Sequence, residues 1–536
     1  MQKLTVEAKA AQLLMFGFPG TEVSPFLKDF ILQNGLGGVI HFARNVKNPS
    51  QLAALNHELQ SIARESPNGI GLLIAADQEG GTVVRLTEGV AVPPSAMALG
   101  AAGSKSITER ICSLSGFELA ATGINMVFAP VLDVNSNPLN PVIGVRSFGE
   151  NPARVAEHGS AAIRGFQRYV AAVAKHFPGH GDTELDSHLA LPAVQHGRQR
   201  LAEVELLPFR KAIAKNVSGI MTAHVVFPAI EPTPGLPATL SYRVLTGLLR
   251  DELGYEGLIL TDCMEMAAIS ETFGTVEAAV MAVEAGADLI LISQTEARQR
   301  GAFEAIVAAV KSGRIPEERL DQSLERILKV KHMLLSRAQP PLDLVGSREH
   351  IEIVRKAINR SITVVQDQGS LPIREGTRIL VVEPIKTAAN IAEDRLVNVG
   401  TLAAALLGQG LTNLEQMTVT AQVSPEEHRA VLAKAQGFDM VVVVTSDAHR
   451  QKGQAGLVRA LIDAGRRVIA VGARTPYELA AFPDVPTYVA AYGSRPMVWD
   501  ETAKVLVGKS RAAGRLPVTI PTALKSAYRN GKDAGN

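Results

Sequence analysis

The sequence of 536 residues contains little cysteine and almost no net charge. Its two cysteines, Cys112 and Cys263, are too few for a framework of disulfide bonds or for a zinc site made of thiolates alone. The 54 lysines and arginines nearly balance the 53 aspartates and glutamates, so no overall field would attract nucleic acid or an acidic membrane. The composition therefore favours a small, neutral binding partner and argues against nucleic acid.

Long apolar segments are also missing. No stretch is apolar for long enough to cross a bilayer, and the start MQKLTVEAKAAQLLMFGF lacks the basic region and apolar core of a signal peptide. We expect no membrane segment and, for the chain as given, a cytoplasmic protein, while secretion stays open if a signal peptide was removed. Aromatic residues make up only 4%, with the single tryptophan Trp499, which argues against a long stacking surface for a polymer.

Short apolar runs alternate with helical stretches through residues 1–335. Each run is continuous, which is typical of parallel strands covered on both faces, and the spacing leaves room for a helix between runs. The pattern predicts an α/β fold of the (β/α)8 barrel type, with an open, doubly wound sheet as the competing fold. The predicted strands lie in residues 13–16, 37–42, 72–77, 124–134, 170–176, 218–224, 257–262 and 287–292.

The rest of the chain predicts a second domain. The prolines of QPPLDLVGS stop the preceding helix and indicate a linker over residues 336–349. Further apolar runs with helices between them predict a smaller, layered α/β sandwich domain over residues 350–525, and the polar residues 526–536 predict a disordered tail. The predicted strands of this domain lie in residues 378–383, 439–447, 466–472 and 487–493.

Many of the predicted barrel strands end in polar residues. The carboxyl ends of barrel strands are where active sites collect, so we expect these side chains to converge at one mouth. An aspartate there can attack an electrophilic carbon, ligate a metal or cap the next helix, and the segment around Asp262 leaves these alternatives open. The strand-end residues are Asp77, Asp133, Lys175 with His176, His224 and Asp262.

The loop KHFPGHGDTELDSH, residues 175–188, carries three histidines and two aspartates. In an extended loop, residues two apart point the same way, so Asp186 can contact the ring of His188, fix its tautomer and raise its basicity. The pair is a candidate acid–base catalyst, with a solvated surface loop as the alternative. His176 and His180, with Asp182, Asp186 and His188, also offer enough donors for zinc. Against a zinc site, the proline and glycine between His176 and His180 break the helical spacing of a reliable ligand pair.

This loop, which continues as LALP to Pro192, resembles the signature loop of the β-N-acetylhexosaminidases of glycoside hydrolase family 3. GGVIHFARN, IAADQEGGTVVRL, FAPVLDVN, NPVIGVRSFGE and LILTDCMEM resemble further blocks of that family in the same order. RKAINRSITVVQDQGSLPI and GRLPVTIP resemble the start and the end of the family's second domain. The resemblance covers almost the whole chain.

The resemblance implies a retaining, exo-acting β-N-acetylglucosaminidase that removes terminal, non-reducing N-acetylglucosamine from peptidoglycan fragments or chito-oligosaccharides. It implies that Asp262 is the nucleophile that forms a covalent glycosyl intermediate, that His188 is the acid–base catalyst and that Asp186 is the partner of His188. It implies no metal and no cofactor. The positions that it implies for holding the sugar are Asp77, Arg85, Arg146, Lys175 and His176.

Two positions depart from the family pattern. Cys263 stands where many relatives have a second aspartate, and Thr82 replaces an arginine, so both could alter the pocket. Three other functions stay open: a β-N-acetylglucosaminide phosphorylase with the same residues, since a neutral histidine repels phosphate less than a carboxylate does; a metal-dependent barrel hydrolase; and a sugar-binding protein without catalysis. Asp77 and Arg85 could also form a purely structural ion pair.

Overall fold

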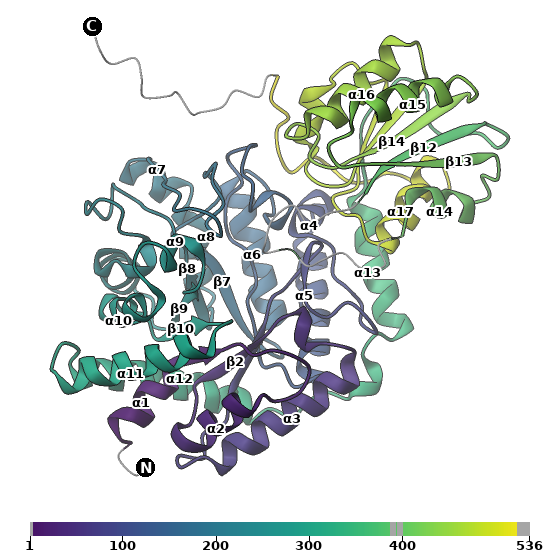
Figure 1. Cartoon of the computed structure of the whole chain (residues 1–536). Helices are drawn as coiled ribbons and strands as arrows, with labels where there is room; N and C mark the ends of the chain where they lie inside the picture. Colours follow the sequence, from purple (N-terminus) through teal and green to yellow (C-terminus); the bar gives the residue numbers. More distant parts are fainter. Residues whose placement is uncertain (1–3, 386–392, 394–399, 523–536) are drawn as a thin grey trace, which may run out of the picture.

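The computed structural model describes residues 4–385, 393 and 400–522, so the predicted tail lies outside the described residues. Eight parallel strands close into a barrel in the order β1-β10-β9-β8-β7-β6-β3-β2, which confirms the predicted (β/α)8 barrel (Figure 1). The strands are β1 (Leu14–Phe16), β2 (Gly38–His41), β3 (Leu73–Ala76), β6 (Met126–Val127), β7 (Ala171–Phe177), β8 (Gly219–Thr222), β9 (Leu258–Cys263) and β10 (Leu289–Ile292).

Burial on both faces explains why the barrel strands read as continuous apolar runs. Every residue of β7 is buried, including the two polar residues that it carries to the mouth. The strand predicted over residues 124–134 is wrong in its length, because only Met126–Val127 forms a regular strand. Pro130 has no backbone N–H to donate to a ladder, and beyond it a single bridge joins Val131 to Lys175.

Helices surround the barrel, and their ends follow local sequence signals. Ser24 accepts a hydrogen bond from the Leu27 N–H at 3.3 Å, and Gly35 ends the same helix with φ of 69°. The helices are α1 (Val6–Gln12), α2 (Pro25–Asn34), α3 (Pro49–Glu65), α4 (Ala96–Ala102), α5 (Lys105–Ala121), α6 (Pro152–Phe166), α7 (Arg198–Glu203), α8 (Leu206–Ile213), a π-helix (Arg243–Glu252), α9 (Ala267–Ser270), α10 (Thr275–Ala285), α11 (Glu296–Lys311) and α12 (Glu317–Leu335).

A small hairpin follows β3 at the mouth of the barrel. Its strands β4 (Gln78–Gly80) and β5 (Val83–Val84) are antiparallel, and the Gln78 side chain accepts a hydrogen bond from the Arg85 N–H at 2.9 Å. This bond folds the segment back on itself. It places Arg85 next to the end of β3, where Asp77 lies.

The second domain is built on a six-stranded sheet in the order β11-β16-β15-β14-β12-β13, which confirms a layered α/β domain after the barrel. Only β11 runs antiparallel to its neighbour, β16. The strands are β11 (Thr363–Asp367), β12 (Ile379–Pro384), β13 (Leu414–Val419), β14 (Met440–Thr445), β15 (Val468–Gly472) and β16 (Thr487–Ala490). The helices are α13 (Arg348–Ser361), α14 (Leu402–Gly408), α15 (Pro425–Ala435), α16 (Lys452–Asp463) and α17 (Pro496–Leu506).

The second domain contacts the loops at the carboxyl end of the barrel (Figure 1). Ser95, after the hairpin, donates to the Tyr492 carbonyl at 2.8 Å, and Asn135, after β6, donates to the Tyr477 hydroxyl at 3.0 Å. The domain therefore lies at the same end of the barrel as the predicted mouth. Among the described residues, no helix is both long and apolar enough to cross a membrane.

Candidate active site

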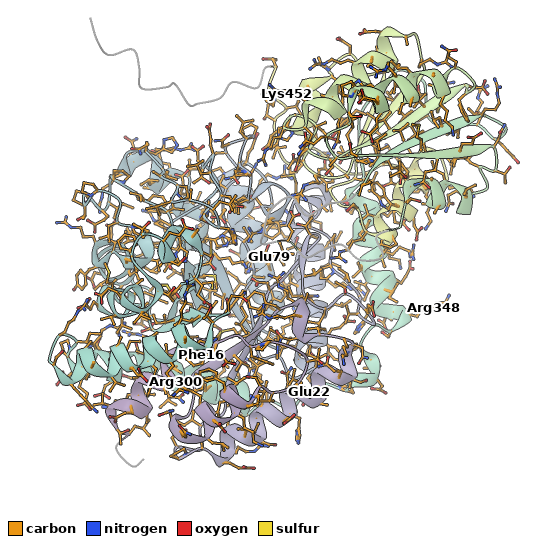
Figure 2. The ribbon with its side chains drawn as sticks, in the orientation of Figure 1. Phe16, Glu22, Glu79, Arg300, Arg348 and Lys452 are labelled. Carbon is orange, nitrogen blue, oxygen red and sulfur yellow. The ribbon has the colours of Figure 1, made fainter. Side chains whose placement is uncertain are left out.

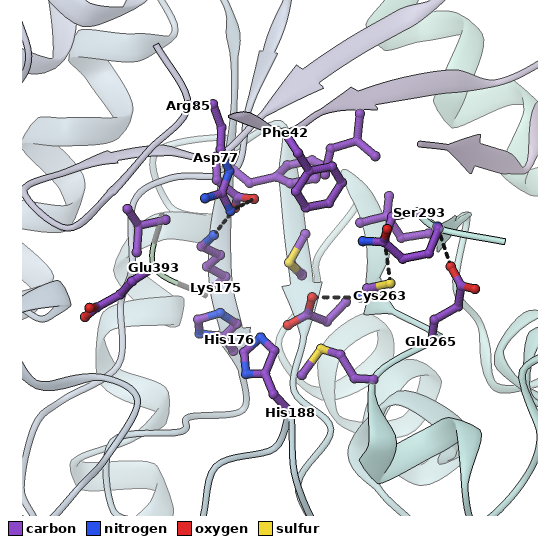
Figure 3. A pocket seen from close by; sticks show the side chains of 18 of the residues that line it. Phe42, Asp77, Arg85, Lys175, His176, His188, Cys263, Glu265, Ser293 and Glu393 are labelled. Carbon is purple, nitrogen blue, oxygen red and sulfur yellow. Dashed lines mark hydrogen bonds and ion pairs between the residues drawn. The ribbon is translucent and has the colours of Figure 1, made fainter. Parts of the chain in front are cut away.

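A cavity of about 720 Å³ lies at the carboxyl end of the barrel (Figure 3). It is lined by every residue that the sequence analysis predicted for catalysis or for holding the sugar except Asp186, which contacts the far side of the His188 ring. Strand-end residues from β3, β7 and β9 meet here because parallel strands all end at the same rim. Asp133 and His224, also predicted for the mouth, do not line the cavity but contact residues that do.

Asp262 extends from β9 into this cavity and is partly exposed. Its Oδ1 accepts a hydrogen bond from the Cys263 N–H at 2.7 Å. The next helix begins at Ala267 with Met266 as its N-cap, so Asp262 does not cap it. Burial would raise the pKa of Asp262, but His224, His176 and His188 outweigh it and lower the pKa. The carboxylate is therefore ionised, which suits a nucleophile.

His188 faces the same cavity, and Asp186 holds its ring from behind. The His188 Nδ1 lies 2.7 Å from Asp186 Oδ1, and the same oxygen accepts the His188 backbone N–H at 2.9 Å. The two residues form a tight turn, with Leu189 and Ala190 donating to the Asp186 carbonyl, and not the extended loop that the sequence analysis assumed. The contact between the side chains is nevertheless the predicted one, and it leaves Nε2 directed away from Asp186.

A second histidine–carboxylate pair lies beside the first. His176 Nδ1 is 2.7 Å from Asp133 Oδ2, and its Nε2 is 3.4 Å from Arg146 Nη2. Because a guanidinium only donates hydrogen bonds, His176 Nε2 is the acceptor in its contact with Arg146. The ring proton is therefore on Nδ1, which donates a hydrogen bond to Asp133. Burial would raise the pKa of Asp133, but His176 outweighs it and lowers the pKa. This pair is therefore a fixed acceptor for Arg146.

A network of buried charges closes one side of the cavity. Lys175 Nζ lies 2.6 Å from Asp77 Oδ1 and 2.7 Å from Glu79 Oε1. Arg85 Nη2 contacts Asp77 Oδ2 at 3.0 Å, and Arg146 holds Glu79 with two contacts of 2.8 Å. Asp77 and Arg85 thus do form an ion pair, and that pair is part of the cavity wall.

The network keeps its charges although it is buried. Burial would raise the pKa of Asp77, but the charges of Lys175 and Arg85 outweigh it and hold the pKa well below its usual range. Burial would likewise lower the pKa of Lys175, but Asp77 and Glu79 raise it. The wall therefore offers ionised donors and acceptors in a fixed arrangement, which can form charge-assisted hydrogen bonds with the polar groups of a ligand.

The sequence analysis missed several residues of the site. Glu79, which Figure 2 labels, lies in β4 of the hairpin at the mouth of the barrel, and its role depends on pairing with Lys175 and Arg146. Glu393 lines the cavity from the second domain and is held by Arg474 through contacts of 2.6 and 3.1 Å. No local sequence signal connects residue 393 to the barrel. The second domain therefore contributes to the cavity wall.

The two departures from the family pattern have different positions. Cys263 lines the cavity, where its Sγ lies 2.8 Å from Ser293 Oγ, and burial raises the pKa of its thiol to about 11, so the thiol stays protonated. Thr82 lies outside this cavity and lines a neighbouring one of about 670 Å³ between the domains. Arg85 borders both cavities. Cys263 is thus the departure that touches the site.

The histidines and aspartates of the loop do not converge on one point. His180 contacts Thr183 and Ser187, Asp182 pairs with His196, and the two remaining pairs are those already described. Within residues 4–385, 393 and 400–522, no group of three or more His, Cys, Asp or Glu side chains is arranged to hold a metal ion.

The fold and the site together define a barrel enzyme with a carboxylate and a paired histidine facing one cavity. The family model for the glycosyl hydrolase family 3 N terminal domain matches residues 5–330, and the model for the C-terminal domain of the same family matches residues 362–535. The chain belongs to glycosyl hydrolase family 3.

Relatives match over both domains. A β-hexosaminidase A from Pseudoalteromonas piscicida is 33% identical, over 93% of this chain and 92% of the relative. A β-N-acetylglucosaminidase/β-glucosidase from Cellulomonas fimi is 31% identical, over 85% of this chain and 84% of the relative. The solved structure of a family 3 β-N-acetylglucosaminidase from Paenibacillus sp. str. FPU-7 is 44% identical, with a TM-score of 0.92 over 98% of this chain and 100% of that one.

Proposed function

We propose that this protein is an exo-acting, retaining β-N-acetylglucosaminidase. It removes terminal, non-reducing N-acetylglucosamine from peptidoglycan fragments or chito-oligosaccharides. The observation that carries this proposal is that His188, paired with Asp186, and the ionised Asp262 face one cavity. The names of relatives that cover most of the chain support N-acetylglucosamine as the sugar.

In the first step, His188 gives the proton on Nε2 to the glycosidic oxygen while Asp262 attacks the anomeric carbon. The bond from that carbon to the leaving oxygen breaks as the glycosyl–aspartate bond forms. In the second step, His188 takes a proton from water, whose oxygen displaces Asp262. Two displacements at the same carbon retain the β configuration. Asp186 holds the ring through Nδ1 in both steps.

Exo action is supported by the charge network. Lys175, Asp77 and Arg85 stand at one side of the cavity with side chains that are 3, 14 and 7% exposed. A fixed wall of this kind, at one side of the cavity, can bind the hydroxyl groups of a terminal sugar. We assign Asp77, Arg85, Arg146, Lys175 and His176 to that role.

The test is release of 4-nitrophenol from its β-N-acetylglucosaminide in phosphate-free buffer with a chelator present. We expect wild-type activity, loss of at least about 10³-fold in Asp262→Ala and of about 10²-fold or more in His188→Ala. Asp182→Asn changes a loop carboxylate outside the cavity and serves as the matched control. The β anomer of N-acetylglucosamine, seen by NMR as the first product, tests retention.

Three results would contradict the proposal. Full activity in Asp262→Ala would remove the nucleophile from the mechanism. Activity that appears only on addition of phosphate, with N-acetylglucosamine 1-phosphate as product, would make the protein a phosphorylase with the same residues. Equal rates on the corresponding β-glucoside would remove the selectivity for the acetamido group.

A further inference from the structure

The loop after β7 contains a histidine that the proposed mechanism does not use. His180 is 2% exposed and does not line the cavity, so it cannot meet the substrate directly. Burial lowers the pKa of His180 to about 4, against the opposing effect of Asp133. Near neutral pH the ring is therefore uncharged and offers one donor nitrogen and one acceptor nitrogen.

Both ring nitrogens of His180 contact hydroxyl groups of the same loop. Nδ1 lies 2.8 Å from Thr183 Oγ1, and Nε2 lies 2.9 Å from Ser187 Oγ. Ser187 is 3% exposed and stands between Asp186 and His188 in the chain. The ring thus ties the start of the loop to the residue that separates the two members of the acid–base pair.

The backbone of His180 is anchored to the barrel. Its N–H donates to Asp133 Oδ1 at 2.6 Å, and its carbonyl accepts a hydrogen bond from Asn140 Nδ2 at 2.8 Å. Asp133 is the carboxylate that also orients His176 in the cavity wall. One continuous set of hydrogen bonds therefore runs from the sugar-binding wall through Asp133 and His180 to Ser187.

We infer that His180 and Ser187 are positioning residues that fix the acid–base histidine, His188, relative to the sugar held by the cavity wall. This inference rests on the proposed function. A general acid must lie within hydrogen-bond reach of the leaving oxygen, and a displacement of about 1 Å can cost about 10²-fold in rate. The contacts of His180 hold the turn that carries His188 against a carboxylate shared with the wall.

The second Asp–His contact of the loop offers a comparison. Asp182 pairs with His196 through side chains that are 23 and 39% exposed, and neither residue lines the cavity. Ion pairs that water reaches are screened and hold their surroundings weakly. Asp182→Asn therefore removes a contact from the same loop without touching the His180 contacts.

The experiment compares Ser187→Ala with Asp182→Asn on two substrates. Phenyl β-N-acetylglucosaminide has a poor leaving group and needs the proton from His188, whereas the 2,4-dinitrophenyl glycoside does not. Because kcat/KM reports the step that breaks the glycosidic bond, we expect it to fall about tenfold for the phenyl substrate in Ser187→Ala and to stay within about twofold for the dinitrophenyl substrate. Asp182→Asn should stay within about twofold on both.

Any other pattern of rates would overturn the positioning role of His180 and Ser187. An equal fall on both substrates would mean a general structural role, and no fall on either would mean no role; both overturn the inference. A wild-type protein that hydrolyses neither substrate overturns the proposed function and this inference with it. If thermal unfolding shows that Ser187→Ala does not fold, Thr183→Val removes the other hydroxyl contact and carries the same expected split between substrates.

Discussion

Two histidine–aspartate pairs in this protein have the same contact distance and different surroundings. The His188–Asp186 and the His176–Asp133 contacts are both 2.7 Å. The side chains of His176 and Asp133 are 6 and 0% exposed, and Arg146 approaches the remaining ring nitrogen of His176. The His188 side chain is 19% exposed, and the described residues place no hydrogen-bond partner on its Nε2.

Under the proposed function, the free ring nitrogen, and not the carboxylate contact, is what distinguishes the proton donor His188 from the binding group His176. A carboxylate at Nδ1 fixes the tautomer in both pairs. Only at His188 is the other nitrogen open to the cavity, where a leaving oxygen can receive a proton. At His176 that nitrogen is occupied by Arg146, so the ring can only orient and accept.

The largest expected difference is in the response to leaving groups. His188→Ala should lower kcat/KM for the phenyl glycoside by about 10²–10⁴-fold, because general acid catalysis is lost, and affect the 2,4-dinitrophenyl glycoside much less. His176→Ala should lower kcat/KM for both glycosides by a similar factor, because the substitution weakens binding of the sugar that the two substrates share. Steady-state kinetics of the two variants check this. A selective loss for the phenyl substrate in His176→Ala would reverse the roles.

The next largest difference is in stability. Asp133 accepts hydrogen bonds from the His176 ring, the His176 N–H and the His180 N–H, and it is fully buried. Asp133→Asn leaves those donors without a charged acceptor and should lower the free energy of unfolding by about 1–3 kcal/mol. Asp186→Asn should lower the free energy of unfolding less and lower activity more. Among the described residues, the hydrogen bonds of the Asp186 carboxylate are with His188 alone.

Urea unfolding and kcat measured on the same preparations check this double contrast. If Asp186→Asn proved more destabilising than Asp133→Asn, the deeper burial of the His176–Asp133 pair would not explain how the two pairs differ in their contribution to stability.

The smallest expected effect is on pH dependence. The pKa of Asp133 is lowered in the folded protein, so its contribution to stability is fully present above the pKa of the unfolded chain, about 3.9, and is lost as the pH falls through the lower folded value. Wild-type melting temperature should therefore drop below about pH 4. Asp133→Asn should show a shallower drop, measured by thermal unfolding from pH 3 to pH 7. Parallel curves for the two proteins would contradict the assignment.

The sequence predicted the barrel strands and the central strands of the second sheet better than the strands at the edges of that sheet. Strands such as β12 and β14 are fully buried and appear as continuous apolar runs. β11 and β13 were not predicted, because they lie at the two edges of the sheet and are partly exposed, so their sequences are mixed. Edge strands take their place from pairing with a neighbour and not from their own pattern.

The residues of the site could be predicted wherever a polar side chain interrupts an apolar run or a pair lies close in the chain. Asp262 closes a strand, and Asp186 is two residues from His188. Glu79 and Glu393 carried no such signal, because their place in the wall depends on Arg146 and Arg474, each far away in the sequence. The assumed extended loop was wrong because hydrogen bonds from Leu189 and Ala190 turn the chain at Asp186.

The sequence by itself determined the barrel, the second domain and the short-range pairing of Asp186 with His188, because burial period and local spacing are properties of neighbouring residues. Only the tertiary structure decided which of two equal histidine–carboxylate pairs keeps a free nitrogen. That choice depends on Arg146, which the closed barrel brings to His176, and on the turn that directs His188 into the cavity. Closure of parallel strands sets such distances between remote residues, and no local pattern in the chain contains them.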